Sequence, residues 1–518
     1  MTEAQTQTTV DSELILRNVG VNVYFVEAFL RLNLPLTVAL SAFILMCPVL
    51  WNRAPLLYFD TAAYVGNMAK ALDLIFPKSL LPDVTTADGV PSTAGQVFSQ
   101  DNQDNIVYGG RSIYYGALAW LGAATSIWLT VAVQAIALAW LVTLAIRQLV
   151  GTIRPAATLL VVTILATTTS AGFFVGLIMP DIWAALAILA LALLWTPSIV
   201  PLSWAEKVLL YAVLAFSALS HSSHLALIAT LLLLGLLARP LRRAAGHGAV
   251  AIPALAIATG LAGILAFSLV IRTVYGMPPM SRPFITAHLV DLGPTTDLIQ
   301  ETCPESRYAL CDYADRLPMA WTSFLFGRGE EGVFHSAPAD VKRALVDEQV
   351  PLFLHTLRVY PVEVVTGLLA DGVRQLWTLS IDSVPRQPPR TAMTDLGFSP
   401  EMIRMTEISW LYAKPRWVHA ITLLIEMVTA LSALLLLGWG MLRIAGRAGP
   451  TVAGLGPFMA VCLVGVMSNA FICGILASPY GRFQARVVWI LPFLILLMVV
   501  LHVCRTKSET EPSRKITP

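Results

Sequence analysis

An aspartate stands where the first apolar stretch of the chain ends. It is Asp60, which lies between Tyr58 and Tyr64. A carboxylate at the point where an apolar helix leaves the bilayer must reach water or find a partner. We interpret Asp60 as the centre of a reaction site at the membrane surface, on which the other outward loops converge. The alternative is that Asp60 caps the helix that follows it.

A second acidic residue, Asp181, follows Pro180 in a short turn between two apolar stretches. We interpret Asp181 as a catalytic partner of Asp60 that would orient an acceptor or hold a cation together with Asp60. The alternative is again a helix start, because Pro followed by Asp suits the first turn of a helix. One acid per loop makes a poor divalent-cation site, and the Cys and His residues lack zinc-ligand spacing. We therefore expect no metal and no cofactor.

Cationic and aromatic side chains provide candidate substrate contacts near the two acids. Arg482 lies where an outer loop enters the last apolar stretch and could bind a lipid phosphate bidentately. The alternative is an arginine that snorkels to the interface. His221 and His224, three residues apart, could bind a phosphate or a sugar hydroxyl, or could instead pack two short helices together. The remaining expected substrate-binding residues are Tyr64, Arg111 and Tyr115.

The composition is that of a membrane protein. Hydrophobic residues make up 56% of the 518 residues and charged residues only 13%, and the mean hydropathy is +0.71. Because soluble domains carry about 25% charged residues, most of this chain is expected to lie in lipid. The formal net charge is +2, and no basic run with interleaved aromatic residues indicates a nucleic-acid partner.

The hydropathy pattern predicts an all-α polytopic membrane protein with about ten transmembrane helices. We expect a cytoplasmic segment (1–31), a transmembrane module (32–274) with a long outer loop (52–112), and an outer region of amphipathic and irregular structure (275–416). Further helices (417–504) and a cytoplasmic tail (505–518) follow. The expected spans are 32–51, one ending near 145, 157–177, 182–194, two short stretches within 207–238, 249–270, 418–442, 455–476 and 488–503.

The distribution of Lys and Arg predicts the orientation of the chain. The short basic loops fall on one side if about ten spans alternate, and that side is expected to be cytoplasmic. The long loops then share the periplasmic or extracellular face of a bacterial-type plasma membrane. Cys303 and Cys311, eight residues apart on that face, could form a disulfide, which an oxidising compartment permits.

The layout resembles the polytopic, lipid-dependent glycosyltransferases of the GT-C superfold. The resemblance implies an enzyme that takes a sugar from a polyprenyl-phosphate donor on the outer face and passes it to a glycan, lipid or protein. It makes Asp60 the general base or acceptor-orienting residue, Asp181 a second acidic contact and Arg482 a donor-phosphate contact. This sequence departs from family members that carry two acids in one loop, because its segments around Asp60 and Asp181 carry one acid each. The similar segments are Tyr58–Tyr64, Gly110–Tyr115, Met179–Asp181 and Tyr480–Phe483.

Two other classes of function remain open on the sequence. A transporter or lipid flippase would carry ionisable residues in mid-span and helices broken in paired halves. The expected spans here hold almost no charge near their centres. A membrane acyltransferase would need a histidine within the membrane, for which His221 and His224 are the candidates.

Overall fold

The computed structural model describes residues 23–76, 106–197, 199–238, 247–383, 393–394, 398–447 and 454–510, without the side chains of 23–33, 247 and 505–510. Most of the expected N-terminal segment 1–31, the loop tract 77–104, the basic loop 239–243 and the end of the tail 505–518 therefore lie outside the described residues. The described residues form helices and two isolated β-bridges.

Six described helices are long and apolar enough to cross a membrane, which makes this a multi-pass membrane protein. A seventh span is present if the bent pair α18 (Gln349–Val359) and α19 (Pro361–Gln375) counts as one. The expected ten spans are not confirmed. The six spans lie in α2 (Val23–Trp51), α6 (Trp128–Val150), α13 (His247–Tyr275), α23 (Pro415–Ile444), α24 (Leu455–Ala477), and α25 (Gly481–Val488) with α26 (Ile490–Thr510).

The shortfall comes from apolar helices that are too short to span the bilayer. At 1.5 Å per residue, the 14 residues of α9 (Ile182–Trp195) reach only about 21 Å, against roughly 30 Å of hydrocarbon. Every residue of α9 is buried, so this helix is surrounded by protein rather than by lipid. The other short apolar helices are α5 (Ile113–Ala124), α7 (Pro155–Thr168) and α11 (Ser222–Leu237).

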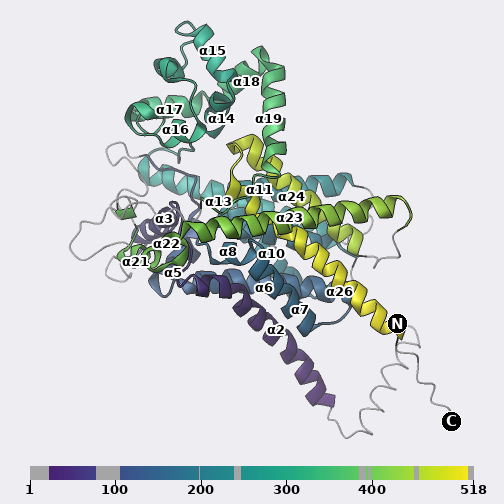
Figure 1. Cartoon of the computed structure of the whole chain (residues 1–518). Coiled ribbons are helices and arrows are strands. Elements are labelled where there is room, and N and C mark those ends of the chain that lie inside the picture. The colour runs from purple at the N-terminus through teal and green to yellow at the C-terminus, as the bar shows by residue number, and fades with distance from the viewer. Residues whose placement is uncertain are drawn as a thin grey trace, which may run out of the picture.

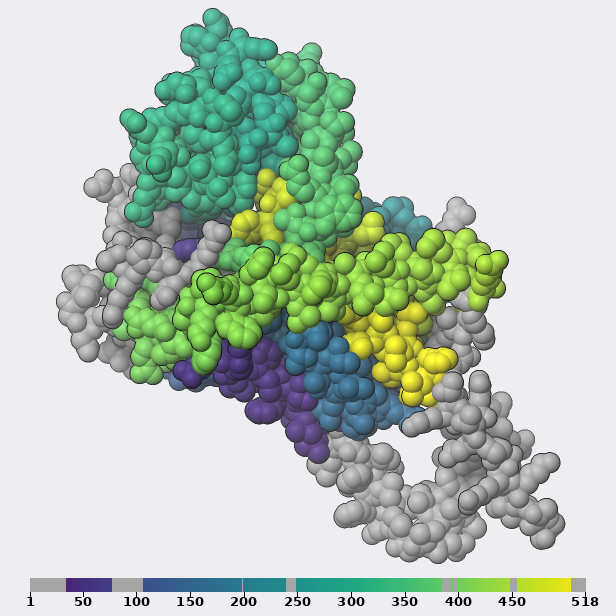
Figure 2. All heavy atoms as spheres, viewed as in Figure 1, coloured from purple at the N-terminus to yellow at the C-terminus, as the bar shows by residue number. Residues whose placement is uncertain are grey.

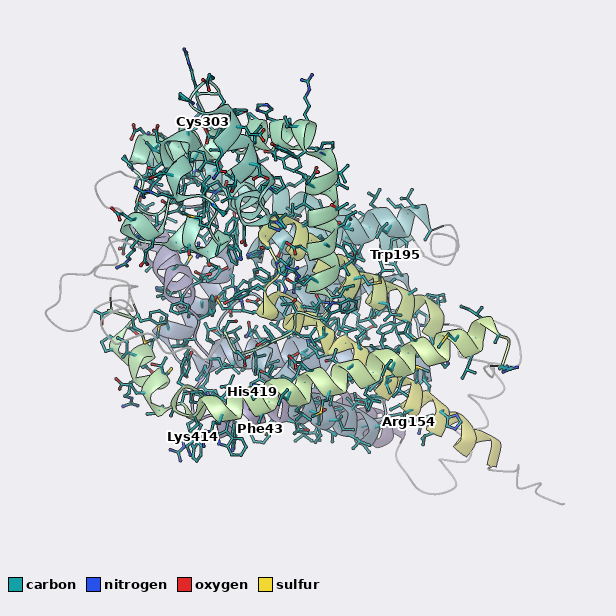
Figure 3. The ribbon with its side chains drawn as sticks, turned by 45° about the horizontal axis from the view of Figure 1, so that its top comes forward. Phe43, Arg154, Trp195, Cys303, Lys414 and His419 are labelled. Atoms are coloured by element: carbon teal, nitrogen blue, oxygen red, sulfur yellow. A yellow bond between two sulfur atoms is a disulfide. The ribbon has the colours of Figure 1, made fainter. Side chains whose placement is uncertain are left out.

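Two large hydrophobic cores organise the described part of the molecule. The larger core is built from the apolar helices around α9. The smaller core lies in a separate lobe, which stands above the apolar helices in Figures 1 and 2. Cys303 and Cys311 form a disulfide in this lobe, at the top of the view in Figure 3. The lobe contains α14 (Phe284–Leu292), α15 (Pro294–Thr302), α16 (Trp321–Phe326), α17 (Ala339–Asp347) and α18.

The expected outer region contains three consecutive helices, α17, α18 and α19, of which Pro361 separates the last two. Pro361 is the first residue of α19, a position that tolerates proline, and the chain bends by 112° between α18 and α19. Helix α19 leaves the lobe and packs along α24 (Figure 1). His288 of α14 joins both helices, since its Nε2 lies 2.9 Å from Asp371 Oδ2 and its Nδ1 lies 3.0 Å from the carbonyl oxygen of Ile475.

Glycine sets the close approach of α19 and α24. A Cβ added at Gly474 would lie 2.6 Å from the backbone oxygen of Asp371, which cannot move aside as a flexible side chain could. Gly474→Ala should therefore destabilise the protein by roughly 1–3 kcal/mol, as overpacking does in cores. Gly456→Ala in the same helix meets nothing within 4 Å and is the matched control. Thermal unfolding in detergent checks this, and equal midpoints for the two variants would contradict the predicted contact.

Candidate active site

Two short backbone pairings bring together the loops that carry the candidate residues. The N–H of Leu56 donates to the carbonyl of Gly176 (2.8 Å), and the N–H of Ile178 donates to the carbonyl of Leu56 (2.9 Å). The loop with Asp60 is thus joined to the turn that precedes Asp181. A second bridge pairs Tyr108 with Met280 and joins the loop before α5 to the segment before α14.

Asp60 lies at the N-terminal end of α3 (Thr61–Asp73), but its side chain makes no capping hydrogen bond. The carboxylate instead forms an ion pair with Arg111, whose neighbour Ser112 caps α5. Burial acts to raise the pKa of Asp60, but the guanidinium of Arg111, helped by Arg482 and Arg282, outweighs burial and lowers that pKa below its ordinary value. The structure favours an ion-paired Asp60 over the helix-cap alternative.

Asp181 is also in an N-cap position, at the start of α9, and also makes no capping hydrogen bond. Its carboxylate lies between two arginines of α25. The Oδ2 atom is 3.6 Å from Nη1 of Arg482, and the Oδ1 atom is 3.7 Å from Nη1 of Arg486. All three side chains are buried. Asp181 therefore shares its negative charge between two cations inside the protein.

The guanidinium of Arg482 is only partly satisfied by the residues around it. Its Cζ lies 4.0 Å from the centroid of the Tyr58 ring, two residues before Asp60. The Tyr58 hydroxyl is 3.3 Å from that of Tyr480. Although Arg482 is only 8% exposed, its Nε and Nη1 have no hydrogen-bond partner among the described residues. A buried guanidinium with free donors is suited to an anionic ligand.

Arg486, one helical turn after Arg482, connects the acids to the histidine pair. It donates to Oδ1 of Asn469 from both Nε (3.2 Å) and Nη2 (2.8 Å), and from Nη2 to the Ser223 hydroxyl (3.3 Å). Nδ1 of His221 lies 2.8 Å from the same hydroxyl and accepts from the backbone N–H of Ser223. His221 caps α11 and lies beside His224, with ring centroids 5.4 Å apart.

Tyr64 and Tyr115 are placed behind the charged cluster rather than within it. Their rings meet edge to face with centroids 5.2 Å apart, and both side chains are fully buried. The Tyr115 hydroxyl donates to Oε1 of Gln134 (3.2 Å). Burial, together with the nearby charge of Asp60, raises the pKa of Tyr64. These two tyrosines support α3 and α5, and no described contact aims them at a ligand.

Among the residues that the structure describes, the site contains more cations than acids. Two carboxylates, Asp60 and Asp181, face Arg111, Arg482 and Arg486. Arg282 lies nearby, stacked over the Tyr108 and Phe326 rings at 4.7 and 5.1 Å. Burial, followed by repulsion from Arg111, lowers the pKa of Arg282 to about 10.

Some residues of this charged cluster are not among the site residues predicted from the sequence. Arg486 could have been found from its position four residues after Arg482, which puts both on one helix face. The placement of Arg282 depends on the Tyr108–Met280 bridge, which no local pattern indicates. The other members of the cluster that were not predicted as site residues are Tyr58, Ser223, Asn469 and Tyr480.

Within the described parts of the chain, no three His, Cys, Asp or Glu side chains gather in a group that could hold a metal ion. Comparisons with protein-family models, with curated proteins and with solved structures give no match for this chain.

The ion pair between Asp60 and Arg111 predicts a pH effect with a definite sign. The contribution of the pair is complete above the ordinary pKa of an aspartate and is lost as the pH falls through the lowered pKa. Arg111→Gln removes the largest interaction that lowers this pKa and leaves burial to raise it. The pKa of Asp60 should therefore rise in the variant. An infrared titration, with Arg111→Gln/Asp60→Asn identifying the carboxyl band, measures it, and an unchanged or lower pKa would contradict this account.

Proposed function

We propose that this chain is a membrane glycosyltransferase that moves a sugar from a polyprenyl-phosphate donor to an acceptor. The observation that carries the proposal is that three arginines, of which Arg482 and Arg486 are buried, face two carboxylates, Asp60 and Asp181, among the described residues. Uncompensated buried charge is unfavourable, so the cluster suits a ligand that brings negative charge of its own. Arg482 is the proposed phosphate ligand, because its Nε and Nη1 make no hydrogen bond to a described residue, although Nη1 is ion-paired with Asp181.

A lipid-linked donor fits the location of the cluster. Arg482 and Arg486 lie in the first turns of the apolar segment Gly481–Cys504, where a span begins. A polyprenyl tail dissolves in the bilayer whereas its phosphate and sugar do not, so such a donor would present its phosphate at this depth. We place the site on the non-cytoplasmic face of a bacterial-type plasma membrane, in keeping with the distribution of Lys and Arg.

The proposed reaction is an inverting transfer. An acceptor hydroxyl attacks the anomeric carbon of the sugar, and its proton passes to the carboxylate of Asp60. The bond between that carbon and the donor phosphate oxygen breaks, and the electron pair stays on the polyprenyl phosphate. Arg482 stabilises the charge that develops on the leaving phosphate. Asp181 holds Arg482 and Arg486 in place through its ion pairs with both.

Arg111 links donor binding to the basicity of Asp60 in this proposal. While Arg111 pairs with Asp60, the carboxylate is a weak base because its pKa is lowered. A donor phosphate would compete for the Arg111 guanidinium, since phosphate is also a good bidentate acceptor. Asp60 would then become more basic when the donor is bound. The acceptor would approach from the lobe, where Phe326 of α16 contacts Arg282 and Trp321 contacts Tyr480.

One observation favours the alternative, a transporter or lipid flippase. The 112° bend between α18 and α19 is of the kind found in broken or re-entrant spans. However, α18 belongs to the core of the lobe rather than to the apolar helices, whereas α19 packs on α24 and contacts α25. The charged cluster therefore supports transfer chemistry better than passage through the membrane.

A transfer assay separates the two functions. Purified protein in nanodiscs would receive polyprenyl phosphate carrying a radiolabelled sugar, together with oligosaccharide, lipid or peptide acceptors. We expect radiolabelled sugar on one acceptor class, with one free polyprenyl phosphate released for each sugar transferred. Donor that stays intact, but moves between leaflets of a sealed vesicle only when the protein is present, would instead establish a flippase.

A further inference from the structure

A cluster of tryptophans and cations lies where two spans end, outside the site described above. The ring of Trp51, the last residue of α2, lies 6.1 Å from that of Trp410 and 6.0 Å from that of Trp417. Arg53 Cζ and Lys414 Nζ lie 4.9 and 4.1 Å from the centroid of Trp410. Two cations therefore share one indole.

The local backbone is built to hold this arrangement. Arg53 has φ = 69°, in the left-handed region that side chains other than glycine seldom adopt. The buried side chain of Asn52 holds the turn, since its Nδ2 donates to the carbonyl of Ala54 (2.8 Å) and its Oδ1 accepts from the Ser409 hydroxyl (2.9 Å) and the Leu411 N–H (2.9 Å). Strain of this kind persists where the surroundings impose it, and it often marks a functional contact.

No acidic side chain in the described parts of the chain pairs with the cations of this cluster. Arg53 and Lys414 are exposed, and neither forms an ion pair with another residue that the structure describes. Figure 3 shows Lys414 at the N-terminal end of α23, at the edge of the molecule. The spans Leu34–Trp51 and Pro415–Ile444 end and begin here, so the cluster lies at the depth of lipid headgroups.

We propose that this cluster, Arg53 and Lys414 with Trp51, Trp410 and Trp417, binds the headgroup of an anionic phospholipid. The phosphate lies between the two cations, which attract it more strongly than they attract a zwitterionic headgroup. The acyl chains lie on exposed apolar side chains that continue along both spans, namely Leu36, Leu40, Phe43 and Leu50 of α2 and Leu423 and Met427 of α23.

The bound lipid also supports the loop that carries Asp60. Tyr412, two residues after Trp410, bonds to Leu57, three residues before Asp60. Its hydroxyl accepts from the Leu57 N–H (3.1 Å) and donates to the Leu57 carbonyl. The lipid site and the candidate active site are therefore joined by a short hydrogen-bonded path, although the lipid site does not depend on the proposed reaction.

Lipid binding by delipidated protein tests the proposal. Native mass spectrometry would titrate the full chain with phosphatidylglycerol, with phosphatidylcholine and with inorganic phosphate. We expect Arg53→Gln/Lys414→Gln to weaken phosphatidylglycerol binding about thirtyfold, from the contribution of two interfacial cations. Both residues are exposed, so the double variant should fold. If it unfolds, Lys414→Gln alone tests the proposal, because it leaves the turn at Arg53 unchanged.

Arg316→Gln is the matched control, because Arg316 is also stacked on an aromatic ring, 5.2 Å from the centroid of Tyr313 in the lobe. It should leave lipid affinity unchanged. Equal affinity for phosphatidylglycerol and phosphatidylcholine, or no loss in the Lys414 variants, would overturn the proposal. Inorganic phosphate that binds as tightly as the lipid would also overturn it, in favour of a site for free phosphate.

Discussion

Asp60→Asn is expected to lower sugar transfer by about 10²- to 10⁴-fold, the usual contribution of a positioned general base. Asparagine keeps the shape of aspartate but cannot take the proton of the acceptor hydroxyl. The initial rate at saturating donor and acceptor, measured on protein that elutes as a single folded species, gives the effect. A variant that retains more than about a tenth of the wild-type rate would remove Asp60 from this role.

The control must separate the lost base from a lost ion pair. Arg147 and Glu206 form a similar half-buried pair elsewhere, with Nη1 and Oε1 2.6 Å apart. Glu206→Gln should therefore leave transfer unchanged. The double variant Asp60→Asn/Arg111→Gln removes the unpaired cation that the single variant leaves behind. It should be more stable than Asp60→Asn and equally inactive, because restoring neutrality does not restore the base.

Arg482→Gln should lower kcat by about 10²- to 10³-fold, the range seen when one donor that stabilises developing charge is removed. The buried guanidinium has free donors beside Tyr58, and no other described cation of the cluster has that combination. Arg486 is already bonded to Asn469 and Ser223, so it is a poor substitute. Steady-state kinetics with varied donor concentration separates the effect on kcat from that on KM.

Arg482→Lys sharpens this prediction. Lysine keeps the charge but presents a single ammonium group in place of a planar fork. We expect a partial loss of transfer, between the wild type and Arg482→Gln. Arg316→Gln in the lobe again serves as a control that removes a stacked arginine far from the acids. If Arg482→Gln and Arg316→Gln behave alike, Arg482 is not a donor contact.

It could be predicted from the sequence that these loops converge, because charges at the ends of apolar stretches need partners. Asp60, Asp181, Arg111 and Arg482 all lie beside such ends, and the structure brings these side chains into two ion-paired groups. The pairing itself could not be predicted. The Leu56–Leu177 bridge and the bond from Tyr412 to Leu57 join segments far apart in the sequence, and no local pattern encodes them.

The expected ten spans are not confirmed, for a physical reason. Hydropathy reports that a helix avoids water, but it does not distinguish lipid from protein as the surroundings. Helix α9 is apolar on every side, and all its residues are covered by neighbouring helices. The apolar stretch 182–194 predicts a span, but the 14 residues of α9 have the length and burial of a core helix.

A structure of the protein with bound polyprenyl phosphate would show whether Arg482 holds the donor. We expect the phosphate within about 3 Å of the Arg482 guanidinium, the distance of a charge-assisted hydrogen bond. We also expect the polyprenyl chain to leave toward lipid and Asp60 to lie on the side from which an acceptor can enter. A phosphate bound elsewhere, with Arg482 still turned toward Asp181 and Tyr58, would contradict the proposed donor site.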